Sequence, residues 1–153
     1  MTPRRLYSSL ALAEMVTWAL LLVGIVLKYS HITAMGVRIA GPIHGLAFLS
    51  YGAATLLIWA NNRWSFARGV IGLLSTLIPF ATLPFEKNTE RAGLLAGGWR
   101  FRDTSDTPAN ATDHVLALVV RKPMLAFAAI ATVVIVVFFV LLSLGSPLAA
   151  LRN

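Results

Sequence analysis

The stretch YSSLALAEMVTWALLLVGIVL, residues 7–27, is apolar along its length apart from one charged side chain, Glu14. An α-helix rises 1.5 Å per residue, so about 20 such residues cross the roughly 30 Å hydrocarbon core of a bilayer. Three more apolar stretches of similar length follow, at residues 37–60, 66–85 and 123–144. Because backbone groups in lipid must form their hydrogen bonds within their own segment, these stretches predict an all-α, polytopic bundle of four transmembrane helices.

The composition agrees with a membrane protein. Hydrophobic residues make up 58% of the chain and charged residues 12%, with a mean hydropathy of +0.76. A soluble domain carries about 25% charged residues. The absence of cysteine excludes disulfides and thiolate metal sites. The net charge is +7, but basic residues flank the apolar stretches singly or in pairs, as expected at anionic headgroups. The predicted partner is therefore the lipid bilayer, and no nucleic acid is expected.

The spans divide the chain into three parts. Residues 1–91 form a three-span core, and residues 92–122 form an extramembrane loop with a short interfacial helix at 114–120. Residues 123–153 form the fourth transmembrane helix and a short tail. With four crossings, both termini lie on one side and the long loop on the other. The loop side then carries more Lys and Arg, which favours termini outside the cell.

Four polar side chains within or beside the spans are the candidate site: Glu14, His44, Tyr51 and Arg68. A carboxylate in the middle of a span costs about 2.5–3.5 kcal/mol on insertion scales, so Glu14 is expected to face the bundle interior. It could be neutral and hydrogen-bonded to Tyr51, paired with Arg68, or part of a proton relay. The structural alternative is a polar clamp between helices.

The depth of these residues follows from assuming that Lys28 and Arg38 mark one interface. Glu14 is then level with Tyr51, whereas His44 lies about eight residues, or roughly 12 Å, away along the helix axis. A direct hydrogen bond between Glu14 and His44 is not expected.

Small residues predict where the helices approach closely. Gly41, Gly45 and Gly52 place small residues at intervals along the second span, and Gly24 is a matching notch on the first. His44 lies within this face. It either donates a hydrogen bond across a tight contact or serves as a haem ligand, metal ligand or proton carrier.

The remaining signals concern the membrane interface. Lys28, Arg38, Trp59 and Trp64 are typical interface anchors, because long basic and aromatic side chains reach the headgroups from the ends of spans. The sequence contains no catalytic triad, phosphate-binding loop or dinucleotide fingerprint. It predicts no catalytic residue, metal site or cofactor.

The order Glu14, Lys28-Tyr29, Gly41, His44-Gly45, Tyr51 and Pro79-Phe80 resembles a known bacterial family. It is similar to the YdzA-like integral membrane proteins grouped as domain of unknown function 3817. The likeness covers about residues 8–91, and the long loop and fourth span look like an extension. The resemblance implies a multi-pass protein of the bacterial plasma membrane with a three-helix core, and it implies no activity.

Three functions compete. The first is a non-enzymatic accessory or stabilising subunit of a larger membrane complex, suggested by the small-residue faces and the lack of a catalytic constellation. The second is a small proton- or ion-coupled transporter using Glu14, Tyr51 and His44. It would have to be a homo-oligomer, because so few spans make a thin pathway. The third is a haem- or quinone-binding redox protein with His44 as an axial ligand, for which no second intramembrane histidine exists.

Overall fold

The computed structural model describes residues 1–103 and 105–143, and this part of the chain is all-α. The predicted helical fold class is confirmed. The elements are α1 (Pro3–Tyr29), α2 (Met35–Asn62), α3 (Phe66–Leu74), the 3₁₀ turn η1 (Ser75–Leu77), α4 (Thr82–Arg91), α5 (Ala111–Arg121) and α6 (Pro123–Ser143). The helix predicted at 114–120 corresponds to α5. Residues 144–153, the end of the predicted fourth span and its tail, lie outside the described residues.

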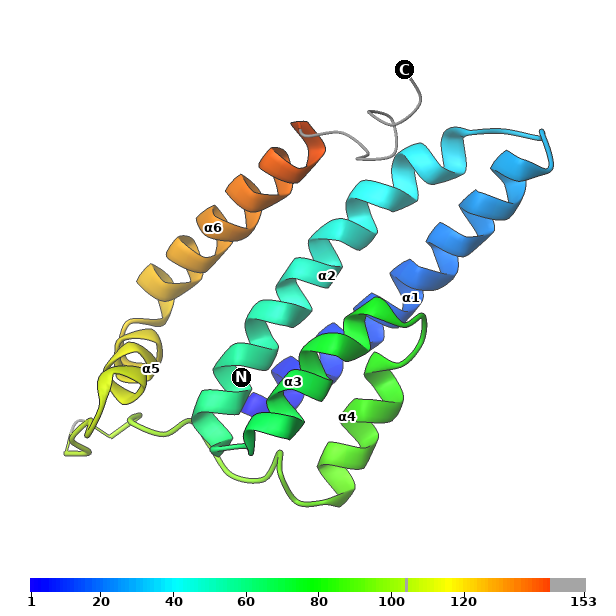
Figure 1. Ribbon diagram of the computed structural model, residues 1–153. Coiled ribbons are helices and arrows are strands. Elements are labelled where there is room, and N and C mark those ends of the chain that lie inside the picture. Colours follow the sequence, from blue (N-terminus) through cyan, green and yellow to red (C-terminus); the bar gives the residue numbers. More distant parts are fainter. Residues whose placement is uncertain (104, 144–153) are drawn as a thin grey trace.

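Within the described residues, three helices are long and apolar enough to cross a membrane: α1, α2 and α6. The Thr2 hydroxyl caps α1 by accepting a hydrogen bond from Arg5 N at 3.3 Å, and Pro3 occupies the first turn, where a missing N–H costs nothing. Figure 1 shows α1 and α2 as a long antiparallel hairpin, with α6 beside α2 on the face away from α1.

The third predicted span is the main difference between sequence and structure. Residues 66–85 were predicted to form one transmembrane helix, but α3 and η1 together cover only Phe66–Leu77, too short to cross the bilayer. The chain then turns back, and α4 runs beside α1 toward the end where α3 began (Figure 1). The two short helices form a re-entrant hairpin.

The turn at the tip of this hairpin explains why hydropathy alone misread it. Ala81 N donates to Ile78 O at 3.1 Å, which closes a four-residue turn around Pro79 and Phe80. Proline in the second position and a positive φ in the third, here 65° at Phe80, are features of a type II turn. Just before the turn, Ile78 N donates to Ser75 O at 3.4 Å.

The register of α1 against α2 also differs from the prediction. Tyr7 lies against Thr55, and Thr17 lies against His44. His44 is therefore level with Thr17, whereas the predicted register places it level with a residue about five positions later in α1. The prediction was wrong because it treated Lys28 and Arg38 as level. Both side chains are exposed at the end of the bundle where the chain passes from α1 to α2, but Arg38 lies one turn inside α2. A long arginine side chain can reach the interface from a deeper backbone position, so the two residues need not be level.

The long loop lies at the same end of the bundle as the N-terminus. Trp99 Nε1 donates to Met1 O at 2.9 Å, and Asn61 Nδ2 near the end of α2 donates to Gly98 O at 3.2 Å. The predicted topology, with the loop opposite the termini, is therefore wrong. Because the hairpin does not cross the bundle, α6 starts at the N-terminal end and finishes at the other (Figure 1).

This arrangement gathers most basic residues at one end. Among the basic residues that the structure describes, the N-terminal end carries Arg4, Arg5, Arg63, Arg68, Lys87, Arg91, Arg100, Arg102, Arg121 and Lys122, whereas the opposite end carries Lys28 and Arg38. We expect the N-terminal end to face the cytoplasm, since cytoplasmic segments near spans are enriched in Lys and Arg.

Thiol labelling tests this orientation. Because the chain has no cysteine, Ser30→Cys and Ser105→Cys place single thiols at opposite ends. A membrane-impermeant maleimide should label residue 30 in intact cells and residue 105 only after permeabilisation. The reverse pattern would contradict this orientation.

Candidate functional site

Glu14 is fully buried on α1 and points to the hairpin. Its Oε2 accepts a hydrogen bond from the Thr82 hydroxyl of α4 at 2.6 Å, while Oε1 has no hydrogen-bond partner within the described part of the chain. The interior position predicted for Glu14 is confirmed. The suggested partners were wrong, because α4 returns alongside α1 and brings Thr82 closer than Tyr51 or Arg68.

Glu86 on α4 is a second fully buried carboxyl group, and it mirrors the first. Its Oε1 accepts a short hydrogen bond from the Ser8 hydroxyl of α1, and its Oε2 lies 3.5 Å from the Lys87 ammonium. Each of the two helices thus supplies one carboxyl group and one hydroxyl group to the other. We call Ser8, Glu14, Thr82 and Glu86 the carboxyl clamp.

An ion pair closes the same interface at its outer end. Arg4 on α1 pairs with Glu90 on α4, and Lys87 Nζ lies 3.2 Å from the Glu90 carboxylate. The hydrogen bond from Lys87 and the nearby Arg4 charge hold the pKa of Glu90 below its usual value. This ion pair is partly exposed, so its contribution to stability is small compared with that of the buried clamp.

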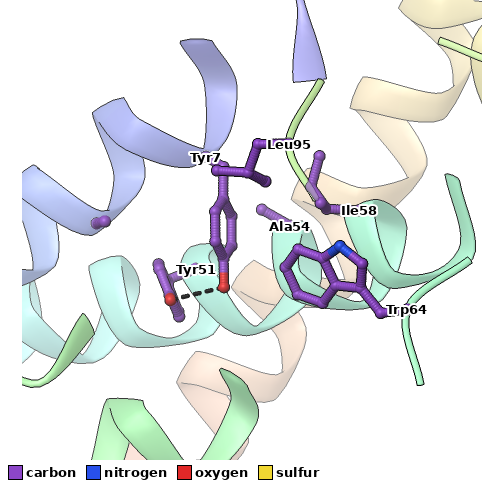
Figure 2. Close-up of a cluster of buried hydrophobic side chains, with 7 residues drawn as sticks. Tyr7, Tyr51, Ala54, Ile58, Trp64 and Leu95 are labelled. Carbon is purple, nitrogen blue, oxygen red and sulfur yellow. Dashed lines mark hydrogen bonds between the residues drawn. The ribbon is translucent and has the colours of Figure 1, made fainter. Parts of the chain in front are cut away.

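A cluster of hydroxyl groups lies between α1 and α2. Figure 2 shows the contact between the Tyr7 and Tyr51 hydroxyl groups. The Tyr7 hydroxyl lies 2.7 Å from the Tyr51 hydroxyl and 3.2 Å from Thr55 Oγ1, and the two tyrosine rings stack with centroids 5.0 Å apart. Both tyrosines are fully buried, and Trp64 packs edge-on against Tyr7. Tyr51 therefore serves the α1–α2 contact through Tyr7 rather than as a hydrogen-bond partner of Glu14.

His44 lies about two helical turns from Tyr51 along the same α1–α2 interface and is 8% exposed. Its Nδ1 lies 3.1 Å from Thr17 Oγ1, and the Thr17 hydroxyl also donates to the Glu14 carbonyl oxygen at 2.9 Å. The Trp18 ring packs against the imidazole, with centroids 4.4 Å apart. His44 and Glu14 are thus linked through Thr17, which agrees with the prediction that they form no direct bond.

Arg68 is tied to the hairpin instead of to Glu14. Its Nη1 donates to Asn88 Oδ1 and Thr89 Oγ1, both at 3.2 Å, which joins the start of α3 to the end of α4. The guanidinium therefore closes the open end of the hairpin. The suggested Glu14–Arg68 pair is wrong, because Arg68 stays near the end of the bundle where α3 begins.

Among the predicted packing glycines, Gly24 lies at a true close approach. A Cβ on Gly24 would lie 2.7 Å from the carbonyl carbon of Gly36, so the two backbones are in direct contact. Gly36 was not predicted. A Cβ on Gly45 would lie 3.4 Å from the Phe138 ring of α6, whereas a Cβ on Gly41 or Gly52 would meet nothing within 4 Å. The close packing expected at Gly41 and Gly52 is therefore wrong in the described chain, because α1 meets α2 on a different face.

The two tryptophans predicted as interface anchors have packing roles. Trp64 is 5% exposed, and its Nε1 donates to Leu94 O at 2.9 Å. Trp59 Nε1 donates to Trp64 O at 3.0 Å, and its ring covers Gly69 so closely that a Cβ there would lie 2.1 Å away. The hairpin and the segment after it cover this end of α2, so Trp64 is buried rather than exposed to headgroups.

Sequence reasoning missed Ser8, Thr82 and Glu86, and with them three of the four residues of the carboxyl clamp. A signal was present: Thr82, Glu86 and Thr89 recur at i, i+4 and i+7, which places three polar residues on one helix face, and all three are fully buried. The described residues contain no cluster of three or more His, Asp or Glu side chains arranged to hold a metal ion.

The architecture and the buried polar contacts define a small polytopic helical membrane protein. The chain belongs to the family described as Domain of unknown function (DUF3817), whose model matches residues 4–91. The resemblance inferred from the sequence is confirmed, and the long loop, α5 and α6 lie beyond the matched region.

A relative in Streptomyces coelicolor bears the name "Putative membrane protein SCO5905". It is 40% identical over 107 residues, which cover 69% of this chain. Those residues are only 12% of the relative, so this chain matches a small part of a much longer protein. No solved structure matches the chain.

Proposed function

We propose that the protein is a non-enzymatic accessory or stabilising subunit of a larger membrane complex. The observation that carries the proposal is that the polar side chains of the bundle bond to one another. Glu14 and Glu86 bond across α1 and α4, His44 bonds to Thr17, and Tyr7 bonds to Tyr51. Such contacts hold helices together, as expected of a compact module whose outer surface binds a partner.

The length of the relative supports the same proposal. A segment 40% identical to this chain occupies 12% of the Streptomyces coelicolor protein, where it is covalently joined to a much larger chain. A module that occurs within a long membrane protein is a natural candidate to associate with one when it is encoded separately. The bacterial source of the relative and the apolar spans favour a multi-pass location in the bacterial plasma membrane.

The test is affinity purification from native membranes in a gentle detergent, followed by native mass analysis. We expect one large membrane protein to co-purify at fixed stoichiometry. The matched control is the same purification from cells that carry the tag on an unrelated membrane protein with three spans. Recovery of the chain only as a monomer or homo-oligomer, from membranes of cells grown under several conditions, would contradict the accessory role.

Proton- or ion-coupled transport is the second candidate, and one observation favours it. In the part of the chain that the structure describes, Glu14 Oε1 and Glu86 Oε2 are buried without a hydrogen bond, although Lys87 Nζ lies 3.5 Å from Glu86 Oε2. Buried carboxyl groups within a membrane commonly mark proton or ion pathways. In liposomes, Glu14→Gln should abolish proton-driven flux under this candidate. Glu90→Gln, the same chemical change in the outer ion pair, should leave the flux largely intact. Equal flux in wild type and Glu14→Gln would remove this carboxyl group from any transport mechanism.

A further inference from the structure

A long groove separates α6 from the α1–α2 hairpin. Its volume is about 730 Å³, within the range of roughly 300–1,000 Å³ typical of small-molecule sites. The walls are almost entirely apolar and include Leu10, Leu57, Phe127, Ile130 and Val134.

The groove is about as long as one leaflet of a bilayer. Its lining runs on α6 from Pro123 to Ile135 and on α2 from Leu57 to Leu46. Twelve residues of helix rise about 18 Å, close to half of the roughly 30 Å hydrocarbon core. Beyond the groove, α6 packs closely against α2, since a Cβ placed on Gly45 would lie 3.4 Å from the Phe138 ring. The groove is therefore too short for a full transmembrane helix of a partner.

The open end of the groove is polar and positively charged. Trp99 and Arg102 line it at the end of the bundle where basic residues gather, and Trp99 is fixed there by its bond to Met1 O. The Arg102 side chain is exposed and makes no hydrogen bond or ion pair within the described part of the chain. By contrast, Arg100 two residues earlier is paired with Asp113 at 2.5 Å.

We propose that this groove binds one anionic phospholipid, with an acyl chain between α2 and α6 and the phosphate on Arg102. An apolar slot of leaflet length with a cation at its headgroup end matches the shape and charge of such a lipid. The bound chain would fill the space that α6 leaves against α2 and hold α6 in place. This inference is independent of the accessory role.

The test uses the full chain, purified, delipidated in a nonionic detergent and examined by native mass spectrometry. The probes are phosphatidylglycerol and the zwitterionic phosphatidylcholine. We expect one phosphatidylglycerol per chain, bound at least about tenfold more tightly than phosphatidylcholine, a difference of about 1.4 kcal/mol. Glycerol phosphate without acyl chains should not compete, because the groove supplies most of the contact. Equal binding of the two lipids, or competition by glycerol phosphate, would overturn the proposal.

Two pairs of variants locate the site. Ala126→Phe fills the groove, whereas Ala128→Phe makes the same change at an exposed position of α6 outside it. Only the first should reduce phosphatidylglycerol binding by about tenfold or more. Arg102→Gln should reduce the preference for phosphatidylglycerol, and Arg91→Gln, an exposed arginine outside the groove, should not.

Melting temperatures of the lipid-free variants show whether each protein remains folded. If Ala126→Phe melts like Ala128→Phe and still binds lipid like wild type, the groove is not the site. A disulfide-linked dimer formed efficiently by Ala126→Cys in native membranes, with no bound lipid, would assign the groove to a second copy and would also overturn the proposal.

Discussion

Gly24→Ala is expected to lower the free energy of unfolding by about 1–3 kcal/mol, the usual cost of overpacking a closely packed site. The new Cβ would lie 2.7 Å from the carbonyl carbon of Gly36 and 2.8 Å from Val37 N. These are backbone atoms, which cannot rotate away as the end of a flexible side chain can, so α1 and α2 would have to separate. Unfolding by titration with a denaturing detergent, followed by circular dichroism, measures the change.

Gly52→Ala is the matched control on the neighbouring helix. A Cβ at Gly52 would meet nothing within 4 Å, and alanine is a better helix former than glycine by about 1 kcal/mol. We therefore expect Gly52→Ala to leave stability unchanged or to raise it. Equal destabilisation by the two variants would mean that the backbone contact between Gly24 and Gly36 is not specific.

Thr82→Val is expected to destabilise the bundle by about 1–3 kcal/mol, because it leaves a buried carboxyl group with no hydrogen bond to replace the one it loses. Valine has nearly the shape of threonine, so the change removes the 2.6 Å bond to Glu14 Oε2 with little loss of packing. Glu14 Oε1 has no hydrogen-bond partner in the described chain, which makes the carboxyl group depend on this one hydroxyl.

A double-mutant cycle separates this bond from other effects. In the Glu14→Leu background, Thr82→Val should cost much less than in the wild type, giving a coupling energy of about 0.5–3 kcal/mol. Thr132→Val on α6 is the control, because that exposed hydroxyl donates to Ala128 O of its own helix at 2.8 Å. A coupling energy near zero in the same detergent would show that the Glu14–Thr82 contact does not stabilise the fold.

Hydropathy predicted α1, α2 and α6 to within a few residues at each described end, because long apolar stretches allow only a helix in lipid. It failed for residues 66–85, where the direction of the chain depends on a turn. Apolar residues on both sides of Pro79-Phe80 look the same whether the helix continues or reverses. The reversal depends on tertiary contacts, chiefly those that α4 makes with α1.

The wrong course predicted for residues 66–85 also explains most of the wrong contacts predicted within the candidate site. Glu14 and His44 were recognised because polar groups in an apolar stretch are conspicuous. Glu86 was not, because it lies in a charged segment that reads as a surface loop. Its burial depends on Ser8, whose role is invisible until α4 is placed beside α1. Residues far apart in sequence supply each carboxyl group and its hydroxyl partner, so spacing alone could not pair them.

The re-entrant hairpin also has a consequence for biogenesis. The ten-residue helix α4 carries Glu86, Lys87, Glu90 and Arg91, and charged residues of this kind do not leave the translocon for lipid on their own. The acceptor for α4 is a surface on α1 that presents Arg4 and Ser8 to it. We expect α1 and α2 to enter the bilayer first and to act as the template on which the hairpin is inserted. The carboxyl clamp would then form late, and only where the earlier helices have paired in the correct register.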